Sequence, residues 1–320
     1  MTMRWLLLSV SGMTLAAGQG LAAEPGCSAS AQTQRVACEF DLRDDFFTAS
    51  AQCLDNSNVD PACIDDAYAS YDEGAEECAE VLDARLDLCN ALDDATHDPA
   101  FGEDHAASFV DPLQIGVSIA PNPWFPLVTG NTWRYAGDDE TVEVVVTDET
   151  KLIDGITCVV VVDTAAEDGE VVEITRDWYA QDVDGNVWYC GEIAENFESF
   201  DGDETEGPEL VDIDGSWKAG RDDAEVGILL PFTPVAGDIF RQEFAQTDAE
   251  DVIEILATDA TETAPGGACA GDCLQTRDST PLEPDAQENK YYAPGLGLIV
   301  EIDIETGDRV ELIEFTGAGS

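Results

Sequence analysis

Cysteines and carboxylates are the side chains of this sequence that could do chemistry. The chain has 10 cysteines, 69 aspartates and glutamates, and only 2 histidines. Six of the cysteines are separated by 11, 15, 10, 15 and 11 residues: Cys27, Cys38, Cys53, Cys63, Cys78 and Cys89. Separations of 11 and 15 residues are close to three and four turns of an α-helix. The symmetric spacing therefore predicts two antiparallel helices that are crosslinked at matched heights.

Disulfide formation is the chemistry that this spacing favours. Zinc ligands usually come in pairs two to four residues apart, and these six cysteines contain no such pair. Of the 15 possible connectivities, the nested one keeps every pair level. The predicted bridges are Cys27–Cys89, Cys38–Cys78 and Cys53–Cys63, and the other four cysteines are expected to pair as Cys158–Cys190 and Cys269–Cys273. A redox-active Cys269 and Cys273 pair is the alternative, although its spacing is not C-x-x-C.

Histidine-dependent catalysis is disfavoured, and we expect no identifiable catalytic residue. Both histidines, His97 and His105, lie in an acidic segment, so a Ser-His-Asp or Cys-His hydrolase would depend on them. They could form a metal site with Asp98, Glu103 and Asp104, but solvated side chains are the favoured interpretation. Paired carboxylates could hydrolyse a glycan, yet 69 acids leave any choice of pair arbitrary.

Calcium is the one cofactor that the sequence suggests. Asp182, Asp184 and Asn186 form one candidate loop, and Asp212 and Asp214 begin another. An EF-hand loop needs glycine at its sixth position and an acid at its twelfth, whereas here the glycine is fourth in both segments. Hairpin turns are therefore the favoured interpretation, with a weak surface calcium site as the alternative.

The charge balance restricts the partners of the chain. With 13 basic and 69 acidic residues the formal charge is -56, which repels nucleic acid and anionic membrane surfaces and attracts cations. Net charge concerns solubility and association more directly than any single site. As the explanation of this negative charge, adaptation to a salty medium is therefore favoured over dedicated calcium binding.

Residues 1–23 are typical of an export signal. Arg4 is followed by a mostly apolar run and then by small residues that end at Ala23. The run is shorter than the roughly 20 residues of a membrane-spanning helix, so no membrane insertion is expected after its removal. Export agrees with the even number of cysteines, and predicts a secreted or periplasmic bacterial protein.

The rest of the chain divides into a disulfide-crosslinked helical hairpin (24–93), an acidic connector (94–123), an antiparallel β domain (124–316) and a tail (317–320). Short turn signals separate segments of alternating polarity, which predict a curved or barrel-like sheet and an α+β fold class. The predicted strands are 141–148, 156–163, 171–180, 187–192, 239–244, 252–257, 296–303 and 309–315. The hairpin is expected to be a spacer or an arm that binds a protein partner.

Aromatic residues of the β domain are candidate pocket residues. Trp133 and Tyr135 share one face of a strand because alternate side chains point the same way. A pocket for a lipid, sugar or pigment would draw its lining from these two residues and Trp178, Trp188, Trp217 and Tyr291. Aromatic side chains more often fill a core, which is the favoured interpretation.

The segment Phe125–Tyr135 resembles the opening motif F-P-L-x-x-G-N-x-W-x-Y of a family of uncharacterised secreted bacterial proteins. Segments 177–182, 185–189, 214–217 and 290–297 agree with that family in the same order. The resemblance covers most of residues 124–316 and implies an exported β domain without implying an activity. The helical hairpin lies outside the similarity.

Three hypotheses of function follow. The first is a non-enzymatic binding or structural protein of unknown ligand, which the scarcity of histidine and the disulfide pattern favour. The second is an extracellular glycan hydrolase that uses carboxylates. The third is a calcium-dependent surface or adhesion component.

Overall fold

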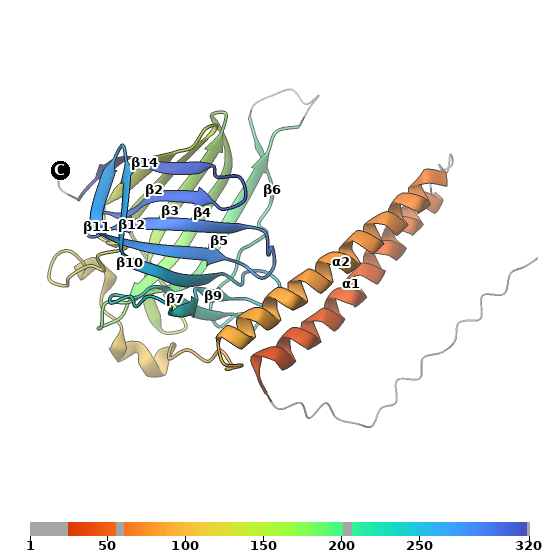
Figure 1. Cartoon of the computed structure of the whole chain (residues 1–320), viewed down its shortest axis with the longest axis horizontal. Coiled ribbons are helices and arrows are strands. Elements are labelled where there is room, and N and C mark those ends of the chain that lie inside the picture. The colour runs from red at the N-terminus through yellow and green to blue at the C-terminus, as the bar shows by residue number, and fades with distance from the viewer. Residues whose placement is uncertain (1–24, 56–60, 201–206, 319–320) are drawn as a thin grey trace, which may run out of the picture.

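A computed structural model describes residues 25–55, 61–200 and 207–318. The predicted signal peptide (1–23), the expected turn after Asp55 and the end of the tail lie outside these described residues. A helical hairpin extends from one end of a β-barrel, as Figure 1 shows. The predicted α+β fold class is confirmed.

The helical hairpin, here called the arm, consists of α1 (Cys27–Asp55) and α2 (Pro61–Ala91). All three predicted bridges between its helices, Cys27–Cys89, Cys38–Cys78 and Cys53–Cys63, are present. The helices approach closely where Gly74 faces Leu42, since a Cβ at Gly74 would lie 2.3 Å from Leu42 Cδ2. Asp94 follows the arm and accepts a 2.7 Å hydrogen bond from the backbone N–H of Ser28, at the start of α1.

Neither helix of the arm has the combination of length and apolar character that spanning a membrane requires, and the same holds for every other helix in the described ranges. The connector contains two short 3-10 helices, η1 (Glu103–Ser108) and η2 (Pro112–Gln114).

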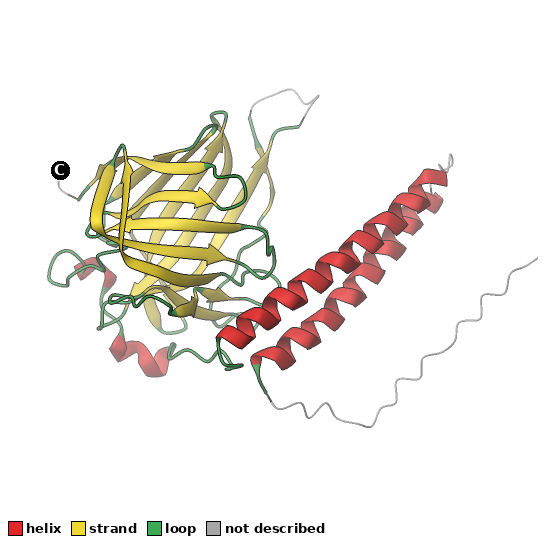
Figure 2. Ribbon diagram, in the orientation of Figure 1, coloured by secondary structure: helices red, strands yellow, loops and turns green. Residues whose placement is uncertain are grey.

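The β domain is a nearly closed antiparallel barrel of fourteen strands in the described part of the chain (Figure 2). Its strands are β1 Thr132–Ala136, β2 Glu140–Ile153, β3 Ile156–Glu167, β4 Glu170–Gln181, β5 Val187–Glu198, β6 Glu209–Asp212, β7 Glu225–Leu230, β8 Ile239–Arg241, β9 Glu243–Phe244, β10 Val252–Ala264, β11 Gly267–Ser279, β12 Gln287–Ala293, β13 Gly297–Asp303 and β14 Arg309–Thr316. The neighbour order is β8-β10-β11-β12-β13-β14-β1-β2-β3-β4-β5-β7-β9, and β6 pairs with β5. The two ends of this order, β8 and β9, are separated only by Gln242, so the chain itself joins the ends of the sheet.

Side chains alternate between the barrel interior and its outer face, as the pleat of a strand requires. On β4, Asp177 and Tyr179 point inward, while Trp178 between them points outward. Predicted strands are confirmed at most positions, although several are longer than expected. β2, for example, extends to Ile153 and β10 to Ala264.

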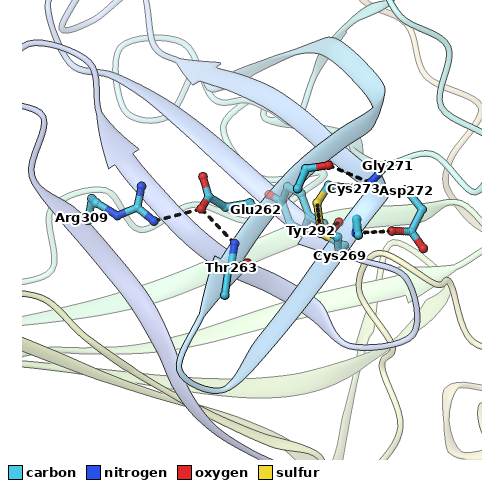
Figure 3. Close-up of a disulfide and its surroundings, with 10 residues drawn as sticks. Glu262, Thr263, Cys269, Gly271, Asp272, Cys273, Tyr292 and Arg309 are labelled. Atoms are coloured by element: carbon cyan, nitrogen blue, oxygen red, sulfur yellow. Dashed lines mark hydrogen bonds and ion pairs between the residues drawn. A yellow bond between two sulfur atoms is a disulfide. The ribbon is translucent and has the colours of Figure 1, made fainter.

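The predicted strand 239–244 is divided at Gln242 into β8 and β9, and β7 was not predicted. Cys269 and Cys273 lie in β11, which was not predicted as a strand either. Glycines obscured this strand, yet β10 pairs with it on both sides of a bulge. The predicted Cys269–Cys273 disulfide closes that bulge, as Figure 3 shows. Gly271 at its tip has a φ of 82°, a conformation that glycine adopts without strain. The Gly271 N–H donates to Thr261 Oγ1 of β10 at 2.8 Å.

The fifth predicted bridge, Cys158–Cys190, links β3 to β5 across the intervening strand β4. Both of its cysteines are fully buried, as is Cys273. This burial favours a structural role over a redox-active one, since reactive cysteines need solvent access. Together the five disulfides indicate an oxidising compartment, which is extracellular or periplasmic.

Candidate functional site

The barrel encloses a cavity of about 540 Å³. Its lining comes from β1–β5, β7 and β11–β14, and thus from most of the circumference of the sheet. The volume lies within the about 300–1,000 Å³ that is typical of small-molecule sites. The cavity is therefore the main candidate site of this molecule.

Aromatic side chains form much of the cavity wall. Trp133 and Tyr135 of the sequence prediction both line it, and they are joined by Phe125, Tyr179, Tyr189 and Tyr292. The indole N–H of Trp133 and the hydroxyl group of Tyr135 are hydrogen-bonded to backbone carbonyls. Trp133 Nε1 donates to Leu296 O at 2.6 Å, and Tyr135 Oη donates to Leu298 O at 3.2 Å. These contacts fix the two rings in the wall.

Carboxyl groups dominate the charge of the cavity. In the described part of the chain its lining carries one basic side chain, Lys290, and eight acidic ones: Glu140, Asp163, Glu173, Asp177, Asp251, Asp278, Glu288 and Glu301. A cavity of this composition repels anions. It favours cations and hydrogen-bond donors.

Lys290 of β12 neutralises one side of the cavity. Its Nζ atom lies 3.0 Å from Glu301, 3.1 Å from Glu288 and 3.7 Å from Asp278. Burial lowers the pKa of Lys290, but the surrounding carboxylates outweigh burial and hold that pKa well above its usual value. The ammonium group is therefore charged and fully engaged with its own acids.

Asp163 of β3 also lines the cavity, but it is not one of the three acids that pair with Lys290. Burial, followed by the charges of Asp177 and Glu173, raises the pKa of Asp163 to about 8. Near neutral pH this carboxyl group is thus largely protonated. A cation placed beside it would stabilise its ionised form.

The hydroxyl group of Tyr189 links Asp177 of β4 to Glu192 of β5, which lie directly opposite each other in the ladder. Tyr189 Oη lies 2.5 Å from Asp177 Oδ1 and 2.6 Å from Glu192 Oε2. A tyrosine hydroxyl has one proton and can donate to only one of the two carboxyl groups. The other carboxyl group must be protonated and must donate to the hydroxyl oxygen. Accordingly, burial raises the pKa of Asp177 to about 6 and that of Glu192 to about 8.

Two further buried acids extend this group. Burial raises the pKa of Asp251, which lines the cavity, to about 6. Burial and the charge of Asp251 raise the pKa of Glu243 well above its usual value. The interior of the barrel therefore holds several carboxyl groups that take up protons near neutral pH.

The other candidate pocket aromatics lie outside this cavity. Trp178 is buried on the outer face of β4, where Lys151 Nζ lies 3.4 Å from its ring centroid. Trp188 packs on Phe109 of the connector, and Trp217 packs against Tyr189 in an edge-to-face contact. Tyr291 points away from the interior because its neighbours in β12, Lys290 and Tyr292, point inward.

The candidate calcium loops are turns whose carboxylates bind the turns themselves. Asp182 accepts hydrogen bonds from the backbone N–H groups of Asp184 and Asn186, and from Trp188 Nε1. Asp212 accepts from the Asp214 N–H and from Asn196 Nδ2, and the first of these contacts lowers its pKa. No group of three or more potential metal-ligating side chains is present among the residues that the structure describes.

The connector histidines lie in different environments. His97 Nε2 is hydrogen-bonded to Val226 O at 2.7 Å, and its ring packs against Phe244 between the connector and the barrel. Burial lowers the pKa of His97. His105 is exposed in η1. The two residues do not form one site with the acids between them.

Sequence reasoning missed the acidic part of the cavity, although a signal was present. Asp163 stands two residues after Val161 in β3, and Asp177 stands two residues before Tyr179 in β4. Residues two apart in a strand share a face, so both acids belong to the apolar face of the sheet. An acidic residue at a strand position whose neighbours two residues away are apolar was the feature that could have identified Asp163 and Asp177.

Comparisons of this chain with family models, curated proteins and solved structures found no match. The resemblance of residues 124–316 to a family of secreted proteins thus stays a prediction.

Proposed function

We propose that this protein is a binding protein that holds a small organic cation inside its barrel. The observation that carries the proposal is the composition of the cavity, in which aromatic rings and eight acids surround about 540 Å³ with a single lysine. Organic cations are stabilised by the faces of aromatic rings and by carboxylates. The ligand class is thus an amine or quaternary ammonium group attached to a small apolar body.

The position of Asp163 supports a specific place for the positive group. Lys290 is surrounded by three acids of its own, whereas the wall that carries Asp163 and Asp177 has no basic side chain among the lining residues described. A ligand cation would pair with Asp163 and place its apolar part against Trp133 and Val144.

The setting that we propose is outside the bacterial cytoplasm, either secreted or periplasmic. The five disulfides support such a compartment. We attribute the surplus of surface acids to life in a salty medium, where ions screen repulsion over about 3 Å at 1 M salt.

The ligand class can be tested with three probes of similar shape and different charge. Isothermal titration calorimetry of the disulfide-intact protein would compare benzyltrimethylammonium, benzyl alcohol and benzoate at pH 7.5. We expect the cation to bind one site per chain and benzoate not to bind. Binding of benzoate as tight as that of the cation would reject the proposal.

A matched pair of variants tests the site. Asp163→Asn removes a carboxyl group from the cavity, whereas Asp168→Asn removes a carboxyl group from the exposed β3–β4 turn. We expect Asp163→Asn to weaken cation binding about tenfold, equivalent to about 1.4 kcal/mol, and Asp168→Asn to leave it unchanged. Equal losses in the two variants would mean that only the overall charge of the protein attracts the probe.

A glycan hydrolase is the second candidate, which one pair of residues favours. Asp163 and Asp177 face the same cavity from adjacent strands, with pKa values raised by burial to about 8 and about 6. Two carboxyl groups with separated pKa values are the usual acid and base of glycoside hydrolysis. Hydrolysis of nitrophenyl glycosides that Asp177→Asn abolishes would support this candidate over a binding protein.

A further inference from the structure

The outer face of α1 carries apolar side chains that residues 25–55, 61–200 and 207–318 leave uncovered. Val36, Phe40, Phe47 and Leu54 are 50%, 62%, 67% and 70% exposed. Tyr68 of α2 is 55% exposed, and its ring lies 4.7 Å from that of Phe46 on α1. We call these five exposed residues the arm stripe: Val36, Phe40, Phe47, Leu54 and Tyr68.

The spacing of the arm stripe matches the contact pattern of packed helices. Phe40, Phe47 and Leu54 are seven residues apart, and Val36 lies one turn before Phe40. Positions at steps of four and seven form one seam along a helix, as in a coiled coil. From Val36 to Leu54 the seam extends about 27 Å at 1.5 Å per residue.

The disulfides keep this seam exposed. All three bridges of the arm join α1 to α2 through positions of α1 that lie outside the seam. They hold the hairpin together, and the apolar residues of the arm stripe need not pack inward for that purpose. A contiguous apolar surface that a protein leaves exposed commonly marks an interaction site.

Charge around the arm stripe indicates which partner fits. α1 has five acids and two arginines, and α2 has nine acids and one arginine. Asp44 lies one turn from both Phe40 and Phe47, and Asp65 and Asp72 flank Tyr68 in the same way. Arg43 is the exception within the seam, and its guanidinium lies over the Phe40 ring at 5.3 Å.

We propose that the arm stripe is a docking site for a basic amphipathic helix of another protein. Such a helix would place its apolar seam on Val36, Phe40, Phe47 and Leu54, and its flanking lysines or arginines beside Asp44 and Asp72. A second copy of this chain fits less well, because two chains of formal charge -56 repel each other. This site is independent of the barrel cavity.

Two synthetic peptides test the proposal with the disulfide-intact protein. Each has three heptads with leucine at positions a and d, and they differ only in lysine or glutamate at positions e and g. Fluorescence anisotropy in 0.15 M salt is expected to show one lysine peptide bound per chain and no binding of the glutamate peptide. Equal binding of both peptides, or of neither, would overturn the proposal.

Charge-neutral variants separate docking from general attraction to an acidic surface. Phe40→Ser with Phe47→Ser removes apolar surface and changes no charge. We expect at least a tenfold loss of affinity for the lysine peptide. Thr48→Ser with Gln52→Ser alters exposed positions of α1 outside the arm stripe and is expected to have no effect. Unchanged affinity in the phenylalanine variant would overturn the proposal, with circular dichroism confirming that its helices are intact.

Sedimentation of the protein alone tests whether a second copy of the chain covers the arm stripe. We expect a monomer. A dimer that Phe40→Ser with Phe47→Ser dissociates would show that a second copy covers the arm stripe, and would also overturn the proposal.

Discussion

At the scale of single residues, the barrel interior is defined by carboxyl groups whose pKa values burial raises. The contacts of Tyr189 show that one of its two neighbouring carboxyl groups is protonated, since its one hydroxyl proton cannot be donated to both Asp177 and Glu192. Buried acids with raised pKa values are common at functional sites. They also make the stability of the folded protein depend on pH.

Stability is expected to fall as the pH rises from about 4 to about 8. The folded state raises the pKa of Asp163 and Glu192 to about 8, and of Asp177 and Asp251 to about 6. In the unfolded chain these groups titrate near pH 4, so above that pH the folded state binds more protons. We expect thermal melting to occur at least about 5 °C higher at pH 5.5 than at pH 8.5.

Variants check the origin of this pH dependence. Asp163→Asn with Glu192→Gln should flatten the profile, because the replacements cannot ionise, and Asp168→Asn should leave it unchanged. Asp94, Asp212 and Asp303 are exposed acids with lowered pKa values. They change the stability of the folded protein below about pH 4, outside the range from pH 5.5 to pH 8.5. A melting temperature that rises between pH 5.5 and pH 8.5 would contradict the assignment.

At the scale of elements, the arm is held to the barrel at its base. Arg85 of α2 forms two hydrogen bonds to Glu250, of 2.9 and 2.6 Å, and both side chains are buried. Gln246 Nε2 donates to Ser30 Oγ at 2.8 Å, and Arg241 Nη2 lies 3.4 Å from Cys27 Sγ. A buried bidentate ion pair fixes the orientation of its two side chains as well as the distance between them.

Breaking the Arg85–Glu250 pair is expected to loosen the arm. Arg85→Met leaves the Glu250 carboxylate buried, with the Thr247 N–H as its one hydrogen-bond donor in the described part of the chain, which destabilises by about 3–5 kcal/mol. Arg35→Met removes another arginine of the arm, whose pair with Glu39 is partly exposed, and should change stability by less than about 1 kcal/mol. Hydrogen exchange of the barrel segment 245–251 would measure the difference.

A double variant separates loss of the pair from loss of an arginine. Arg85→Met with Glu250→Met replaces both charges by apolar groups, and much of the stability should return. If the double variant is less stable than Arg85→Met alone, the pair is not what holds the arm.

At the scale of the whole molecule, a strong negative charge is spread over a barrel and a projecting arm. The formal charge is -56, and repulsion of this size opposes compact folding unless ions screen it. The disulfides supply crosslinks that do not depend on charge. Three lie in the arm, which has little core of its own, and two lie in the barrel.

Salt is therefore expected to stabilise the protein. Between 0.1 M and 1 M NaCl the screening length falls from about 10 Å to about 3 Å, so most repulsion between separated surface acids is removed. We expect the melting temperature to rise across this range, and to rise equally in NaCl and KCl because screening does not depend on the ion. A constant melting temperature would contradict adaptation to salt, and a difference between the two salts would indicate a specific ion site.

The sequence by itself determined the antiparallel sheet and the crosslinked arm with its three disulfides, whereas the other four cysteines allowed three pairings. Helical pitch and strand alternation are local properties, so the cysteine spacing and the period of two were sufficient to predict these elements. β11 was missed because glycines weaken the alternating pattern, and only pairing with β10 and β12 shows it to be a strand. Trp133 and Tyr135 share a face of one strand and line the cavity, whereas the sequence favoured core filling and offered a pocket as the alternative.

Only the tertiary structure decided which acids belong to the site. Asp163, Asp177, Asp278 and Glu301 come from four strands, and closure of the sheet brings them to one cavity. Curvature and closure depend on pairings between distant segments, which the alternation of a single strand does not contain. The same holds for Trp178 and Trp188, because only closure decides which face of a strand becomes the inside.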